Sequence, residues 1–164
     1  MKTNWMTRLQ GSEFKVMRLQ ETAPSTDVVC DTPERLVNYV RPQLLPSLRY
    51  NVDTENFGIV FLNTRRRPIG FEIVSNGTLD TILIHPREVF KAAIVMNASA
   101  IILFHNHPSG DPTPSEADIR ITRDLIRAGQ IMKIDVLDHL ILGAPMEGRP
   151  KDWTSLKELG YFHL

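Results

Sequence analysis

The sequence predicts an α/β (α+β) fold in which helices pack on a mixed sheet. Strand-like and helix-like segments alternate along the 164 residues, the pattern of a layered domain. Residues 57–63 and 69–75 are two strand-like runs joined by the short loop TRRRP, which indicates a hairpin of antiparallel strands. Residues 100–104, AIILF, are continuously apolar, as in a strand that is buried on both faces of a sheet.

Composition favours one domain with a substantial core, since 42% of the residues are hydrophobic. Lys+Arg and Asp+Glu both number 19, so the net charge of zero points to neither a nucleic-acid nor a membrane partner. A membrane helix needs about 20 apolar residues, and the longest apolar run here covers only residues 98–104. The single cysteine, Cys30, excludes an internal disulfide, and no signal peptide is evident. We therefore expect a cytoplasmic protein.

Residues 1–30 are expected to form an N-terminal arm, and residues 31–164 the domain. In the arm, FKVMRL (14–19) could be an edge strand, whereas ETAPSTD resembles a linker, so a partly disordered arm is the alternative. The first helix should begin with Thr32 as its cap and Pro33 at its first position. Pro42 and Pro46 predict a kink or a division into two short pieces.

A third strand is expected at TILI (81–84), followed by a helix that begins at Pro86 and runs to residue 97. Its buried side should be formed by Val89, Phe90, Ala93, Val95 and Met96.

Another helix is predicted to follow the buried strand. Thr113 and Glu116 match a capping box, Pro114 fits the first helical position, and Gly129 is a plausible end. The last two elements are expected at residues 134–143, as one bent strand or two adjoining strands, and at 154–160, as a short helix at best.

The chemistry is concentrated where the buried strand ends. His105 and His107 are two residues apart, so strand geometry places both imidazoles on one face, with Asn106 on the other. Asp118 follows eleven residues after His107, in the first turn of the next helix. Two imidazoles and one carboxylate leave a fourth tetrahedral position for water, as in catalytic zinc sites. Explanations without a metal are also possible: the two histidines could be solvated at the end of a strand, and Asp118 could occupy the first turn because the helix dipole favours an acid there.

This pattern resembles the signature of the JAMM (MPN+) metalloproteases: His-x-His, seven residues, Ser, two residues, Asp. HNHPSGDPTPS followed by the Asp, together with TILIHPREVFKAAI and LDHLILG, is similar to the RadC-like branch of that family, over residues 30–164. The resemblance implies a JAMM/MPN-like (cytidine-deaminase-like) curved mixed sheet flanked by helices. It also implies a short form without the N-terminal helix-hairpin-helix region, and Zn2+ bound by His105, His107 and Asp118.

The resemblance further implies two catalytic residues. The family's motif serine matches Ser115, which would stabilise the tetrahedral intermediate. The family's general base precedes a strand in a pattern like Glu-x-x-Gly-apolar, and Glu55 in ENFGIVFL fits it better than Glu72, which lies within a predicted strand. The implied activity is hydrolysis of a peptide or isopeptide bond in an unknown peptide or protein substrate.

Two other functions remain open at this stage. One is a DNA-repair-associated or nucleic-acid-binding protein, which the zero net charge does not favour. The other is a non-catalytic metal-binding scaffold. His139 in LDHLILG is interpreted as a core residue or as a residue that supports the ligands. The sequence does not indicate the substrate or the oligomeric state.

Overall fold

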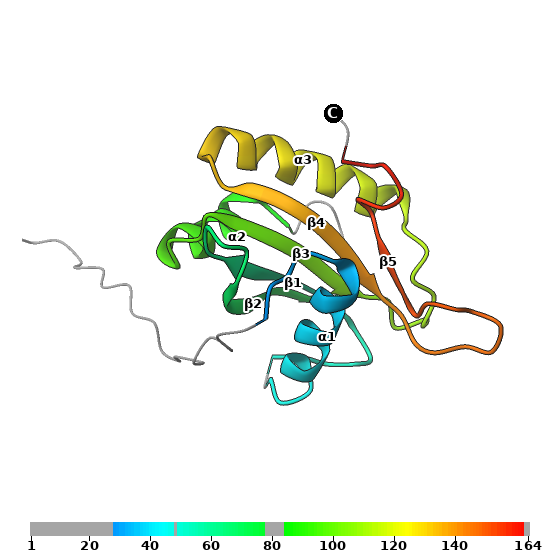
Figure 1. The fold of residues 1–164 in the computed structure, drawn as a ribbon. Coiled ribbons are helices and arrows are strands. Elements are labelled where there is room, and N and C mark those ends of the chain that lie inside the picture. Colours follow the sequence, from blue (N-terminus) through cyan, green and yellow to red (C-terminus); the bar gives the residue numbers. More distant parts are fainter. Residues whose placement is uncertain (1–27, 48, 78–83, 163–164) are drawn as a thin grey trace, which may run out of the picture.

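The computed structural model describes residues 28–47, 49–77 and 84–162, which contain one five-stranded sheet and three helices (Figure 1). Residues 1–27 of the expected arm and residues 81–83 of the expected third strand lie outside the described residues. In chain order the elements are α1 (Pro33–Leu44), β1 (Glu55–Leu62), β2 (Pro68–Gly77), α2 (Pro86–Val95), β3 (Ala100–Asn106), α3 (Glu116–Met132), β4 (Asp135–Leu142) and β5 (Trp153–Ser155).

The sheet is mixed, as predicted. Its strand order is β2-β1-β3-β4-β5, in which β3 and β4 are parallel and the other neighbours are antiparallel. β1 and β2 form the expected hairpin. β3 occupies the middle of the sheet and every one of its residues is buried, which explains its continuous apolar sequence.

The two faces of the sheet carry different helices, and α1 and α3 lie on opposite sides in Figure 1. Each face of the sheet forms a separate hydrophobic core, and alternate residues of β3 point into these two cores. Ile101 and Leu103 pack with α2 and α3, and Ile102 and Phe104 pack with α1. The sheet thus carries helices on both faces, and the start of β1 lies at the same end of the sheet as the end of β3.

The first helix begins as predicted, because the Thr32 hydroxyl oxygen accepts a hydrogen bond from the backbone N–H of Arg35 at 3.3 Å. It is a single helix and not two pieces. Pro42 lies in its last turn, where its missing N–H removes only one hydrogen bond, and Pro46 lies beyond its end.

The expected boundaries of the third helix were wrong at both ends. Ser115 is the cap of α3, whereas the Thr113 hydroxyl donates to the Asp111 carboxylate at 2.8 Å. The helix continues past Gly129 to Met132 and ends on Lys133, which has a left-handed φ of 57°. Gly129 is required inside the helix because a Cβ there would lie 2.5 Å from the backbone oxygen of Ile134.

Two smaller corrections concern α2 and the C-terminal part. Val95 is 46% exposed, and Ala92 takes its place on the buried side of α2. The segment 134–143 contains one strand, β4, which agrees with the first of the two predicted alternatives. The segment 154–160 is not helical: its first residues belong to β5, which pairs with β4, and turns follow. Within the described ranges, no helix is long and apolar enough to cross a membrane.

Candidate metal centre

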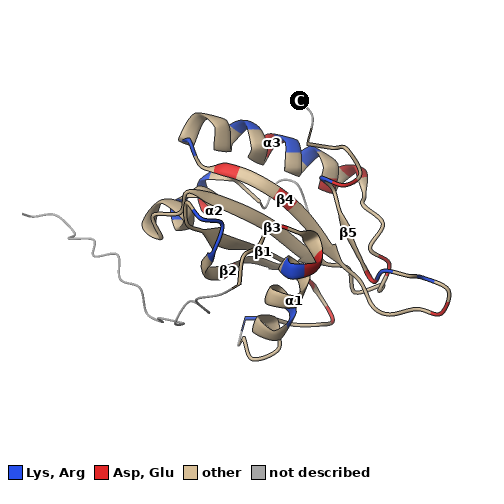
Figure 2. Ribbon diagram, in the orientation of Figure 1, with Lys and Arg blue, Asp and Glu red and all other residues tan. Residues whose placement is uncertain are grey.

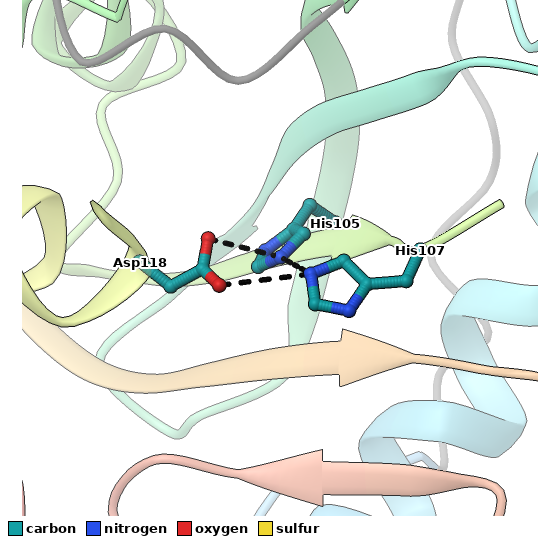
Figure 3. A group of neighbouring side chains, drawn as sticks. All are labelled: His105, His107 and Asp118. Carbon is teal, nitrogen blue, oxygen red and sulfur yellow. Dashed lines mark hydrogen bonds and ion pairs between the residues drawn. The ribbon is translucent and has the colours of Figure 1, made fainter. Parts of the chain in front are cut away.

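Three side chains converge where β3 ends and α3 begins (Figure 3). The His105 Nε2 atom lies 2.9 Å from His107 Nε2 and 3.2 Å from Asp118 Oδ1, and His107 Nε2 lies 3.6 Å from Asp118 Oδ2. β3 supplies His105, the residue directly after the strand is His107, and the first turn of α3 supplies the carboxylate. The structure therefore brings together the three residues that the sequence predicts as metal ligands.

The donor set fits a zinc ion. Ligand atoms in tetrahedral positions about 2.0–2.1 Å from zinc lie roughly 3.3 Å from one another. The separations of 2.9, 3.2 and 3.6 Å, the last two measured to different oxygens of the Asp118 carboxylate, are distributed around this value. One ligand atom from each residue can be chosen so that all three lie within 4.8 Å of one another. Two imidazole nitrogens and one carboxylate oxygen are also the ligand types that zinc accepts in catalytic sites.

The helix cap fixes the carboxylate of Asp118, which is only 1% exposed. The backbone N–H and the hydroxyl of Ser115 each donate to Asp118 Oδ2 at 2.7 Å, and the N–H of Asp118 donates to the Ser115 hydroxyl oxygen at 3.2 Å. This reciprocal capping box explains why an aspartate three residues into the helix points back toward the strand.

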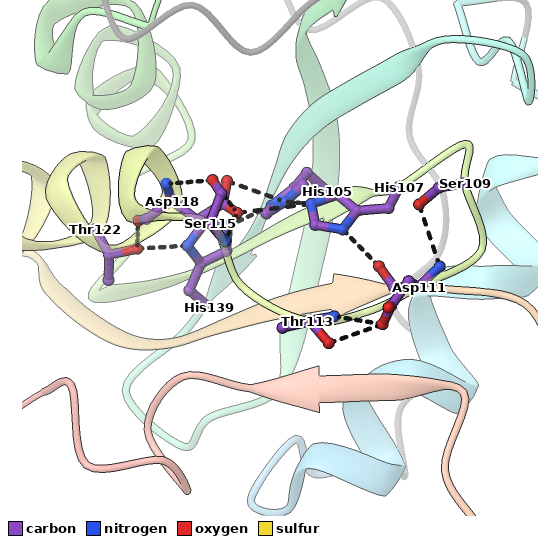
Figure 4. Close-up of polar contacts among 9 residues, drawn as sticks. All are labelled: His105, His107, Ser109, Asp111, Thr113, Ser115, Asp118, Thr122 and His139. Atoms are coloured by element: carbon purple, nitrogen blue, oxygen red, sulfur yellow. Dashed lines mark hydrogen bonds and ion pairs between the residues drawn. The ribbon is translucent and has the colours of Figure 1, made fainter. Parts of the chain in front are cut away.

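Each histidine is held through the ring nitrogen that faces away from the cluster (Figure 4). His107 Nδ1 donates to the backbone carbonyl of Asp111 at 2.6 Å. His105 Nδ1 lies 2.8 Å from His139 Nε2, and the ring of Phe57 stacks beside His105 with centroids 6.4 Å apart. Both imidazoles are therefore oriented with Nε2 toward Asp118.

Burial and hydrogen bonding set the protonation of the site. Burial is the main cause that lowers the pKa of His105 well below its usual value, and it lowers the pKa of His139 to about 4. Burial alone would raise the pKa of Asp118, but hydrogen bonds from His107 and Ser115 and the field of His105 hold it well below its usual range. A hydrogen bond with Asp118 is the main cause that raises the pKa of His107. Neutral imidazoles and an ionised carboxylate are the forms that bind a metal.

The two glutamates considered as general base lie at different places. Glu55 is half-buried at the start of β1, two residues before Phe57. Phe57 pairs with His105, so the alternation of side chains along β1 puts Glu55 on the same face of the sheet as His105. Its charge also contributes to the raised pKa of His107. Glu72 lies in β2, the outermost strand at that side, opposite Ile59, and is 3.8 Å from Arg49. Position therefore favours Glu55, whose catalytic role stays a prediction.

Asn106, between the two histidines, holds the backbone on both sides of Glu55. Its side-chain oxygen accepts from the N–H of Asn56 at 2.9 Å, and its amide donates to the carbonyl of Thr54 at 3.0 Å. Asn56 and Asn106 are both buried. Strand alternation predicts that Asn106 lies on the opposite face from the histidines, but these contacts cannot be predicted from local sequence, because the partners lie about fifty positions earlier in the chain.

Thr122 and Phe57 also contact the histidines, and neither was predicted from the sequence. The Thr122 hydroxyl lies 2.6 Å from His139 Nδ1. The only available signal was that Thr122 is four residues after Asp118, on the same face of one helix. Ser115 was identified and is exposed, yet its hydroxyl contacts Asp118, so its proposed contact with substrate stays a prediction.

Comparison with known proteins identifies relatives of this chain. Residues 30–161 match the family described as the RadC-like JAB domain. A UPF0758 protein from Caldanaerobacter subterraneus is 46% identical over 145 residues, which cover 88% of this chain and 58% of the relative. One from Moorella thermoacetica is 56% identical over 115 residues, covering 70% of this chain and 47% of the relative. One from Methanococcoides burtonii is 40% identical over 163 residues, covering 95% of this chain and 68% of the relative. The chain thus spans about half to two thirds of the length of these proteins.

Proposed function

This chain belongs to the RadC-like JAB domain family, and we propose that it is a zinc-dependent hydrolase that cleaves a peptide or isopeptide amide bond. The observation that carries the proposal is the convergence of His105 Nε2, His107 Nε2 and the Asp118 carboxylate. Glu55 stands at the start of the neighbouring strand, and the exposed Ser115 is bonded to the third ligand. Such a grouping is suited to hydrolysis more than to a purely structural metal.

His105, His107 and Asp118 would hold the ion. When bound, zinc would polarise the scissile carbonyl and lower the pKa of a coordinated water to about 7. The protein leaves this region accessible on one side, because His107 keeps 13% of its side chain exposed while His105 and Asp118 are buried.

Glu55 would act as the general base. Its carboxylate would accept a proton from the attacking water and later deliver that proton to the leaving amine nitrogen. The Asn106 contacts with Thr54 and Asn56 support this role, because they fix the backbone of Glu55 relative to the residue that lies between the two histidines.

The Ser115 hydroxyl would donate a hydrogen bond to the developing oxyanion. This hydroxyl now donates to Asp118, so the role requires it to rotate toward the substrate. The backbone N–H of Ser115 also donates to the same carboxylate oxygen, and it would keep Asp118 in place after the rotation.

The direct experiment compares the variants Glu55→Gln and Glu72→Gln, after zinc loading, against a library of peptide and isopeptide-linked substrates. We expect chelator-sensitive hydrolysis by the wild-type protein. General acid–base catalysis contributes about 10²- to 10⁴-fold, so Glu55→Gln should lose at least about 100-fold in turnover while it retains zinc. Glu72→Gln should stay close to wild type. Full activity in Glu55→Gln would show that this residue is not the base.

The same samples separate the other two functions. A metal-binding scaffold would hold zinc without chelator-sensitive hydrolysis. A nucleic-acid-binding protein would bind DNA with an affinity that falls as salt rises. Basic and acidic side chains are interspersed over the described part of the chain, as in the Arg127–Asp124 pair on α3 (Figure 2), which favours the hydrolase.

A further inference from the structure

A line of buried hydrogen bonds leads from the candidate metal centre into the space between α3 and β4 (Figure 4). His105 Nδ1 contacts His139 Nε2 at 2.8 Å, and His139 Nδ1 contacts the Thr122 hydroxyl at 2.6 Å. The Thr122 hydroxyl in turn contacts the backbone carbonyl of Asp118. The side chains of His105, His139 and Thr122 are all completely buried, so protein groups alone determine this arrangement.

The direction of every hydrogen bond in this line follows from its last member. A backbone carbonyl can only accept, so the single hydroxyl proton of Thr122 is donated to Asp118. The Thr122 oxygen must then accept from His139, which places the proton of neutral His139 on Nδ1 and leaves its Nε2 as an acceptor. His139 Nε2 must accept from His105, which places the proton of His105 on Nδ1.

The Nε2 atom of His105 consequently has no proton and presents its lone pair to the cluster. His107 is in the same state when its ring is neutral, because its Nδ1 proton is donated to the Asp111 carbonyl, whereas the protonated ring also carries an Nε2 proton toward Asp118. Two acceptor nitrogens 2.9 Å apart therefore face an acceptor carboxylate, an arrangement that a cation between them would stabilise.

We infer that His139 and Thr122 are positioning residues, which fix the tautomer and the ring orientation of His105 so that its Nε2 is available to the metal. The inference rests on the proposed metal site. Asp118 contributes to it twice, since its carboxylate joins the cluster and its carbonyl terminates the hydrogen-bond line. The line thus connects the ligand on β3 with the ligand on α3 through one residue of β4.

The alternative is that His139 and Thr122 only satisfy each other in the core, without an effect on the ligands. The two cases differ in the metal-free protein. A positioning role requires the Nδ1-protonated tautomer of His105 to depend on Thr122 and His139, whereas a purely structural role does not.

The first test compares Thr122→Val with Thr122→Ser. Valine keeps the shape but removes the hydroxyl, and serine retains it. Loss of a group that orients a metal ligand typically weakens metal binding by about 10- to 100-fold. We expect a loss of that size in zinc affinity for Thr122→Val, measured by competition with a chromogenic chelator, and a change within about threefold for Thr122→Ser. Nitrogen-15 NMR of the metal-free proteins should show Nδ1-protonated His105 in wild type and Thr122→Ser, and a tautomer mixture in Thr122→Val.

A second pair keeps the inference testable if Thr122→Val does not fold. In His139→Gln the side-chain oxygen can accept from His105 Nδ1 and the amide can donate to Thr122, whereas His139→Leu can do neither. We expect His139→Gln to bind zinc more tightly than His139→Leu by at least about 10-fold. Equal zinc affinity and an unchanged His105 tautomer across both pairs would overturn the inference. If the wild-type protein itself failed to bind zinc, the proposed function would fail, while the NMR comparison would still decide whether the line fixes His105.

Discussion

Replacing Gly58 with alanine would test how closely β1 and β3 pack beside the metal cluster. A Cβ at this position would lie 2.3 Å from the ring carbon Cζ of Phe104 and 2.7 Å from the backbone oxygen of Glu72, so the ring or the strands must move by about an ångström. Overpacking of this kind costs about 1–3 kcal/mol, and the gain of about 0.5–1 kcal/mol from removing a strand glycine offsets only part of it. We expect Gly58→Ala to lower the free energy of unfolding by about 1–2 kcal/mol.

Urea denaturation monitored by circular dichroism provides the measurement, with the double variant Gly58→Ala/Phe104→Leu as the control. Phe104→Leu alone should destabilise through the space it leaves, but in the double variant the added methyl group and the smaller side chain should compensate. The double variant should therefore lose less stability than the sum of the two single variants. Additive losses, or a Gly58→Ala protein within about 0.5 kcal/mol of wild type, would refute the close contact.

Two further predictions concern buried groups elsewhere. Asn106→Ala should lower the free energy of unfolding by about 1–3 kcal/mol in the same assay, because it leaves the Asn56 N–H without its partner. The zinc-loaded variant should lose turnover more than zinc affinity. Unchanged turnover would contradict the inferred effect on Glu55. Cys30 is buried, and desolvation is the main cause that raises its pKa to about 11. Iodoacetamide at pH 8 should therefore label Cys30 in guanidinium chloride but not in the native protein, as measured by mass spectrometry. Equally fast labelling of the native protein would contradict this burial.

Patterns local in sequence predicted most of the sheet and the cluster. The hairpin of β1 and β2, the buried β3 and the cap at Thr32 depend on neighbouring residues, and all three predictions are confirmed. The spacing of His105 and His107 likewise determines a shared face through strand geometry alone, and the structure places both rings there.

The errors arose where tertiary contacts chose between local options. Thr113 and Ser115 can each cap a helix. Ser115 is the cap because the Asp118 carboxylate, which contacts His105, also accepts a hydrogen bond from the Ser115 N–H. Gly129 fits a helix end, but close packing against Ile134 requires it within the helix.

The C-terminal segment shows the same limitation, because its pairing partner lies outside it. TSLKELG has a helical composition, yet Trp153 pairs with Leu142 and starts a strand. His139 was interpreted as a core residue or as a residue that supports the ligands, but its partners could not be predicted, since His105 and Thr122 lie 34 and 17 positions away.

Metal stoichiometry measured by native mass spectrometry tests the central claim most directly. Wild-type protein titrated with zinc should hold one ion per chain, and His107→Ala should lose it at the same zinc concentration. His85→Ala is the matched control, because His85 is exposed at the start of α2 and makes no side-chain capping hydrogen bond; it should retain the ion. Zinc binding that is equally tight in wild type and His107→Ala, or absent from wild type, would contradict a metal centre formed by His105, His107 and Asp118.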